Sequence, residues 1–98
     1  MAGWILQGLR DDTEVVFRIP HGGVRTVGRT ARADFILDAT LVSRVHCRLT
    51  ASPSDQLVVE DLRSTNGTLV NGERVARQVL KPGDTVTIGR VDLEVQQA

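Results

Sequence analysis

The sequence has little of several residue types, and each shortage excludes a class of protein. Its single cysteine, Cys47, excludes an internal disulfide, and one cysteine with two histidines is too few for a structural zinc site. No apolar run approaches the roughly 18 residues of a membrane-spanning helix, and no charged-then-apolar leader marks a secretion signal. We therefore expect a cytoplasmic or nuclear protein that binds neither a metal nor another cofactor.

Aromatic residues and lysine are also scarce. The only aromatic residues are Trp4, Phe17 and Phe35, so the core must consist mainly of Val, Leu and Ile, which suit strands. Twelve basic and twelve acidic residues give zero net charge, which argues against general binding of nucleic acid or membranes. Eleven of the twelve basic residues are arginine, whose planar guanidinium matches phosphate or carboxylate. A GC-rich genome would produce the same excess of arginine over lysine. Only the positions of the arginines in the sequence can therefore distinguish an anion-binding role from a genomic bias.

The length and the pattern of apolar residues predict one all-β domain spanning residues 1–98. A chain of 98 residues buries roughly 60–65% of its unfolded surface, which is enough for one core and not for two. Short apolar or alternating segments are separated by turn residues, a pattern typical of a β-sandwich. The segments are residues 4–9, 14–19, 24–29, 35–37, 45–50, 57–62, 68–70, 73–75, 85–88 and 91–95.

Three local patterns carry more specific expectations. Residues 35–37 are short and wholly apolar, which predicts a buried strand. Asn71-Gly72 predicts a two-residue hairpin turn that needs positive φ at both positions. Residues 75–80 could pass for one helical turn, but the segment is too short to form a helix alone.

Catalysis is a hypothesis that the sequence disfavours. Ser43, His46 and Asp61 are the residue types of a hydrolase triad, but Ser43 does not lie in the G-x-S-x-G turn that exposes a nucleophile. His46 and Cys47 are neighbours in a predicted strand, so the cysteine faces inward, the histidine faces the opposite side, and the two cannot pair. No G-x-x-x-x-G-K-[ST] loop occurs either. We therefore expect no enzyme, with His46 in a structural role and His21 facing solvent.

Arginines and hydroxyl residues gather instead in loops beside the predicted strands. A phosphomonoester carries a charge of about −1.5 to −2 and three acceptor oxygens, which guanidinium, hydroxyl and backbone N–H donors match. Arginine clusters of this kind read a phosphorylated residue in a peptide. Taken singly, each arginine would be a solvated loop charge, and only the clustering favours a phosphate site. The residues concerned are Arg29, Arg44 and Arg63 with Thr30, Ser43, Ser64 and Thr65.

Four motifs occur in order between residues 27 and 72. They are Gly28-Arg29, Ser43-x-x-His46, Ser64-x-Asn66-Gly67-Thr68 and Asn71-Gly72. Each alone is common, but together, in this order and spacing, they resemble the signature of the forkhead-associated (FHA) domain. The resemblance implies an eleven-stranded sandwich of two twisted antiparallel sheets, with loops at one end that bind phosphothreonine in an extended peptide.

The resemblance also implies roles for the residues that match the signature. Arg29 and Ser43 would hold the phosphate, and Arg44 and Thr65 would add donors. Asn66 would hydrogen-bond the peptide backbone beside the phosphothreonine and fix its register. The architectural residues would be Gly28, His46, Gly67, Asn71 and Gly72, with His46 tying the loops together and the last two turning the hairpin.

Sequence preference is a further implication of the resemblance. In the family, the third residue after the phosphothreonine often sets the preference, and it is read by loops beside the phosphate site. Here the apolar Leu41 and the nearby Arg32 suggest an aliphatic residue at that position, with an acidic residue as the rival. A second Gly-Arg pair, Gly89-Arg90, does not match the family's site, and we interpret Arg90 as scaffold.

Together these inferences predict a phosphothreonine-dependent peptide-binding module in kinase signalling. Its partner would be a phosphothreonine-containing protein or peptide that a Ser/Thr kinase has marked, with no nucleic acid or membrane involved. The isolated domain would be a monomer. The competing hypothesis is an FHA-like structural or oligomerisation domain that binds its partners without phosphate.

Overall fold

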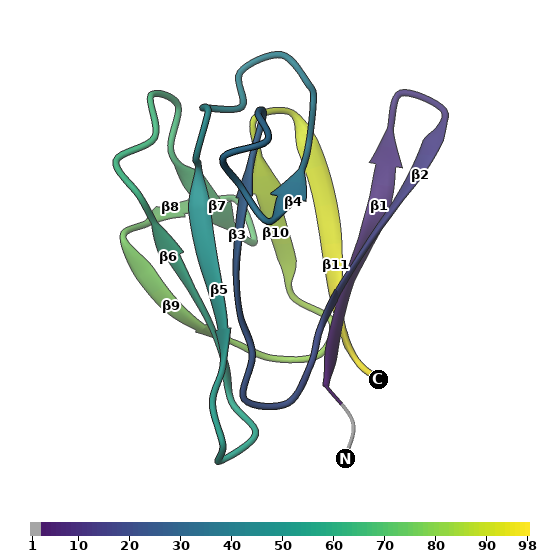
Figure 1. Cartoon of the computed structure of the whole chain (residues 1–98), viewed down its shortest axis with the longest axis vertical. Helices are drawn as coiled ribbons and strands as arrows, with labels where there is room; N and C mark the ends of the chain where they lie inside the picture. The colour runs from purple at the N-terminus through teal and green to yellow at the C-terminus, as the bar shows by residue number, and fades with distance from the viewer. Residues whose placement is uncertain (1–2) are drawn as a thin grey trace.

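The computed structural model describes residues 3–98, which form eleven strands in two facing sheets (Figure 1). The strands are β1 (Trp4–Arg10), β2 (Thr13–Ile19), β3 (Val24–Gly28), β4 (Phe35–Ile36), β5 (Cys47–Ala51), β6 (Leu57–Asp61), β7 (Thr68–Val70), β8 (Glu73–Val75), β9 (Arg77–Leu80), β10 (Thr85–Ile88) and β11 (Val91–Gln97). One sheet has the order β2-β1-β11-β10-β7-β8, and the other has the order β4-β3-β5-β6-β9. The predicted all-β, eleven-stranded sandwich is therefore confirmed. No helix able to cross a membrane occurs within the described range.

Neighbouring strands pair in antiparallel fashion throughout both sheets, with one exception. β3 and β4 run parallel, pairing Val27 with Phe35 and Gly28 with Ile36. β7 and β8 form the hairpin predicted from Asn71-Gly72, and the two turn residues have φ of 51° and 84°. The positive φ that this turn requires explains why the sequence places Asn and Gly there.

Inward-facing side chains of both sheets form the core. Along β11 the residues Val91, Leu93 and Val95 are buried, while the residues between them are exposed. Phe17 and Phe35 stack with ring centroids 4.7 Å apart and join an edge strand of one sheet to an edge strand of the other. Each buried Val, Leu or Ile side chain stabilises the fold by roughly 1.5–3 kcal/mol. The core is thus mainly aliphatic, as the composition predicted.

One prediction about an individual segment was wrong. Residues 35–37 do not form a buried strand, because β4 lies at the edge of its sheet and Ile36 is 54% exposed. An edge strand has a partner on one side only, and a wholly apolar segment shows no alternation that would reveal its open face. Residues 75–80, judged too short to form a helix alone, were left without an assignment, and residues 77–80 of that segment form β9 and pair with β6. The strand β9 forms because β6, a segment distant in the sequence, pairs with it. The residues of β9 themselves show no alternation that would predict a strand.

Connections lie at both ends of the sandwich, and the described ends of the chain meet at the end that carries the β2–β3, β5–β6 and β9–β10 connections (Figure 1). The backbone N–H of Ala98 donates to the carbonyl oxygen of Gly3 at 3.0 Å, which fixes the two ends beside each other. The opposite rim carries the β1–β2, β3–β4, β4–β5, β6–β7 and β10–β11 connections. This rim brings together loops that are far apart in the sequence.

Candidate functional site

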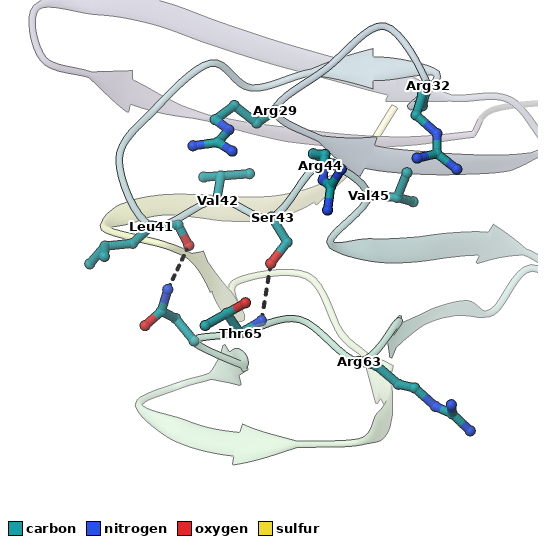
Figure 2. A pocket seen from close by; sticks show the side chains of 10 residues that line it. Arg29, Arg32, Leu41, Val42, Ser43, Arg44, Val45, Arg63 and Thr65 are labelled. Atoms are coloured by element: carbon teal, nitrogen blue, oxygen red, sulfur yellow. Dashed lines mark hydrogen bonds between the residues drawn. The ribbon is translucent and has the colours of Figure 1, made fainter.

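A hollow of about 600 Å³ opens on the loop rim, and we call it the arginine hollow (Figure 2). Four of its lining residues are arginines and none is acidic, although the whole chain has no net charge. All the residues predicted to bind a phosphopeptide or to select its sequence line it. The lining residues are Arg29, Arg32, Leu41, Val42, Ser43, Arg44, Val45, Arg63, Thr65 and Asn66.

Backbone hydrogen bonds place Arg29 directly beside Ser43. The Arg29 N–H donates to the Ser43 carbonyl oxygen at 2.9 Å, and the His46 N–H donates to the Val27 carbonyl oxygen at 2.8 Å. Gly28 permits this approach, since a Cβ atom at that position would lie 2.2 Å from the Arg44 carbonyl oxygen. No other residue fits there without moving the loop that carries Ser43.

Two side-chain bonds then join this loop to the β6–β7 connection (Figure 2). The Thr65 N–H donates to Ser43 Oγ at 3.0 Å, and Asn66 Nδ2 donates to the Leu41 carbonyl oxygen at 3.2 Å. Because Ser43 Oγ accepts its bond from Thr65, its own hydroxyl proton can be donated to a ligand in the hollow. Leu41 has φ of 72°, a left-handed conformation that costs a non-glycine residue roughly 1–2 kcal/mol. The bond from Asn66 helps to hold it there.

His46 lies beneath the hollow and links the same two loops from inside. Its side chain is 0% exposed, Nδ1 lies 3.1 Å from the Ser43 N–H, and Nε2 lies 2.8 Å from the Gly67 carbonyl oxygen. The Ser43 N–H can only donate, so Nδ1 of His46 is the acceptor of that hydrogen bond. In the neutral ring the proton is then on Nε2, which donates to the Gly67 carbonyl oxygen. The prediction that His46 faces outward from a strand was wrong. β5 begins one residue later, so strand alternation does not apply to His46.

Asp61 organises the β6–β7 connection from its other side. The hydroxyls of Ser64 and Thr68 and the Ser64 N–H all donate to its carboxylate. Burial by itself would raise the pKa of Asp61, but the hydrogen bonds from Ser64 and Thr68 outweigh it and hold the pKa below its ordinary value of 3.8. Ser64 Oγ in turn accepts from the Gly67 N–H at 2.8 Å.

From the sequence, Asp61 was considered only as a triad member, and this role was not predicted. Asp is typical of turns in which a side chain bonds nearby backbone groups, and that preference is the only local signal of the role. Ser43 and His46 do not form a triad contact either. The ring bonds the backbone N–H of Ser43, whereas the Ser43 hydroxyl bonds Thr65. Cys47 is buried, and burial raises the pKa of its thiol to about 12, which disfavours a reactive thiolate.

The arginines differ in how they face the hollow. Figure 2 shows the side chain of Arg63 extending away from Ser43, whereas Arg44 lies next to Ser43. Arg63 therefore contributes to the rim of the hollow more than to its centre. Ser43 and the arginines of the β3–β4 and β4–β5 connections line the same hollow.

Comparisons with known proteins agree on one family. The sequence matches the model of the FHA domain over residues 25–89. It is 44% identical over 75 residues to the ABC transporter ATP-binding/permease protein Rv1747 of Mycobacterium tuberculosis, covering 76% of this chain and 8% of that protein. It is 39% identical over 87 residues to the oxoglutarate dehydrogenase inhibitor of Corynebacterium efficiens, covering 81% of this chain and 61% of that protein. The chain thus spans less than two thirds of each of these relatives.

Solved structures show the same fold. The FHA domain of the CT664 protein from Chlamydia trachomatis superposes with a TM-score of 0.87 at 24% identity, covering 95% of both chains. A structure described as an analysis of phosphothreonine-dependent FHA domain interactions gives a TM-score of 0.80 at 28% identity, covering 98% of this chain and 96% of that one. Both matches cover nearly the whole chain.

Proposed function

Because the chain belongs to the FHA domain family, we propose that it is a phosphothreonine-dependent peptide-binding module in kinase signalling. The observation that carries the proposal is the arginine hollow, where four arginines and no acidic residue surround Ser43. A chain with zero net charge that concentrates positive charge in one hollow is suited to a small, highly charged anion. The ligand is a phosphorylated protein segment, and we assign no catalytic role to the domain.

Arg29 and Ser43 are the central phosphate-binding pair of this proposal. A phosphothreonine carries three strong acceptor oxygens, which a guanidinium fork and a hydroxyl proton can bind together. Arg44 and Thr65 supply further donors from the two loops on either side. The bonds that already join these loops keep the donors in place, so little ordering is needed when the ligand arrives.

Asn66 and Leu41 bind and select the peptide around the phosphothreonine. One N–H of the Asn66 amide is bonded to Leu41, and its second N–H and its oxygen can pair with the backbone of an extended peptide. Leu41 presents an apolar side chain and Arg32 a charge at the edges of the same hollow. We expect an aliphatic residue at the third position after the phosphothreonine, and an acidic residue is the rival preference.

The test is calorimetric titration with one threonine peptide in phosphorylated and unphosphorylated forms. We expect a dissociation constant on the order of micromolar for the phosphorylated form, because an extended peptide loses conformational freedom on a small interface. The unphosphorylated form should bind at least a hundredfold more weakly, since about three charge-assisted bonds of roughly 1.5–3 kcal/mol each are lost. Equal binding of both forms would instead support a structural domain that recognises its partners without phosphate.

A further inference from the structure

The strand β2 is the longest edge strand of the described sandwich. The edge strands are β2 and β8 in one sheet and β4 and β9 in the other. β4 has two residues, β8 three and β9 four, whereas β2 has seven. Its register with β1 is continuous over all seven residues, without a bulge, and β2 contains neither proline nor lysine. Native proteins usually protect an edge of this length with one of these features, because its free backbone groups can pair with another strand.

The backbone groups of every second residue of β2 face the open side. In an antiparallel sheet, residues of a central strand bond alternately to the two neighbouring strands. Gly3, directly before β1, accepts from the Ala98 N–H, so the odd-numbered residues of β1 bond toward β11 and the even-numbered ones toward β2. These even-numbered residues lie opposite the odd-numbered residues of β2. The N–H and C=O groups of Glu14, Val16 and Arg18 therefore point to the open edge, where no other strand of residues 3–98 pairs with β2.

The side chains of the same three residues are exposed, and their order makes β2 complementary to itself. When two copies of β2 run antiparallel with Val16 opposite Val16, Glu14 of each copy lies opposite Arg18 of the other. Opposite charges directly across a strand pair attract each other, and like charges repel. Among residues 3–98, neither Glu14 nor Arg18 has an ion-pair partner. Both charges are therefore free to pair across this edge.

The same three residues also select the register. A two-fold register shifted by one residue places Val16 opposite a charged side chain. A shift by two residues places Glu14 opposite Glu14, or Arg18 opposite Arg18, which is destabilising. Among these registers, only the one centred on Val16 pairs unlike charges with each other and the apolar side chain with its own copy. It also uses the full length of β2, because Thr13 then lies opposite Ile19.

We propose that the protein forms a two-fold symmetric dimer in which β2 pairs antiparallel with β2 of a second copy, centred on Val16. The pairing joins two six-stranded sheets into one continuous sheet and gives the free N–H groups of both edges carbonyl acceptors. The dimer goes beyond the proposed function and does not depend on it, because β2 and the arginine hollow share no residue. We expected a monomer from the sequence, which does not show which strand lies at an edge.

The dimer leaves both arginine hollows open. β2 begins at the β1–β2 connection on the loop rim and runs toward the opposite end of the sandwich (Figure 1). Because the two paired strands run in opposite directions, the two rims lie at opposite ends of the dimer. Each copy should therefore bind a phosphothreonine peptide with the affinity of the single domain.

The first experiment is sedimentation analysis of the 98-residue chain over increasing concentration. The parent should form dimers with a dissociation constant of roughly 10–1000 µM, because one strand pair is a small interface. Glu14→Arg and Arg18→Glu each place like charges opposite each other at two positions, and each should weaken the dimer by about tenfold or more. An equimolar mixture of the two variants should restore the dimer, since unlike charges then lie opposite each other at both positions. Arg77→Glu reverses an exposed charge on β9 and should dimerise as the parent does.

The second experiment tests the register by disulfide cross-linking under mild oxidation. In the proposed dimer the two Val16 residues form a hydrogen-bonded pair with Cα atoms about 5.5 Å apart, a distance that a disulfide spans, so Val16→Cys should cross-link. The two Arg18 residues lie four positions apart along the strand, about 13 Å, so Arg18→Cys should not. The native Cys47 is fully buried and should not react.

Three results would overturn the inference. One is a parent that stays monomeric at every concentration, which would leave the edge to a strand of another protein. Another is a dimer that persists in both single charge variants, or a mixture of the two that stays monomeric. The third is equal cross-linking of Val16→Cys and Arg18→Cys. The substituted side chains are exposed, so the variants should fold, and urea midpoints close to that of the parent verify this. The phosphopeptide titration is a separate test, because loss of the dimer should leave the affinity for the peptide unchanged.

Discussion

The backbone N–H of Thr65 donates a hydrogen bond of 3.0 Å to the hydroxyl oxygen of Ser43, although the two residues are 22 positions apart. The bond joins the β4–β5 and β6–β7 connections at the floor of the arginine hollow. This bond uses one lone pair of the Ser43 hydroxyl oxygen, so the hydroxyl proton is still available for donation to a ligand. One contact thus fixes the shape of the site and orients one of its donors.

Replacement of Arg29 should weaken binding without unfolding the domain. Arg29→Ala removes a charge-assisted bond of roughly 1.5–3 kcal/mol, so the affinity for a phosphothreonine peptide should fall at least tenfold. Calorimetry measures the change. Arg18→Ala, which removes an exposed arginine on β2 outside the arginine hollow, is the matched control and should bind normally. An unchanged affinity in Arg29→Ala would remove this residue from the site.

Replacement of Ser43 should affect both binding and stability. Ser43→Ala takes away a ligand donor and leaves the Thr65 N–H without its bond. We expect at least a tenfold loss of affinity and a loss of about 0.5–1.5 kcal/mol in the free energy of unfolding. Urea denaturation measures the second quantity. A variant with lower stability but full affinity would show that Ser43 only shapes the loop.

His46 should matter more for stability than any residue of the binding surface. His46→Ala leaves the Ser43 N–H and the Gly67 carbonyl oxygen unpaired at a fully buried position. The free energy of unfolding should fall by about 2–6 kcal/mol, because each of the two unsatisfied groups costs roughly 1–3 kcal/mol. His21→Ala, in the turn before β3, should change it by less than about 0.5 kcal/mol. Equal urea midpoints for both variants would contradict this role of His46.

Asp61 should make the stability of the domain depend on acidic pH. Its pKa is lowered in the folded state, so it stabilises the fold at pH values above the unfolded-state pKa of about 3.9. This stabilisation is lost as the pH falls through the lower folded-state pKa. Urea midpoints measured from neutral to acidic pH should show Asp61→Asn less stable than the parent at neutral pH, with the difference shrinking below about pH 4. A difference that stays constant with pH would show that the carboxylate charge contributes nothing.

The parts of the molecule that the sequence predicted are those with a local signature. The turn at Asn71-Gly72 is an example, because it needs two positive φ angles that few residue pairs supply. Alternation along β11 revealed which side of that strand is buried. Five of the residues that line the arginine hollow, Arg29, Ser43, Arg44, Thr65 and Asn66, were selected from motifs that combine hydroxyl groups, guanidinium groups and glycine in a fixed order.

The parts that the sequence did not predict depend on contacts between distant segments. The exposure of Ile36 follows from the position of β4 at a sheet edge, which no pattern within three residues can show. β9 exists because β6 offers it a partner. The close approach of β1 to β11, which Gly8 permits, also depends on a segment more than 80 residues away, and the short apolar run over residues 4–9 gave no sign of it.

The measurement that tests the central claim most directly is a crystal structure of the domain bound to a phosphothreonine peptide. The account predicts that the phosphate oxygens lie within hydrogen-bond distance, about 2.7–3.0 Å, of both the Arg29 guanidinium and the Ser43 hydroxyl. The Asn66 amide should contact the peptide backbone in the same structure. A peptide bound on another face, with the arginine hollow filled only by solvent, would contradict the account.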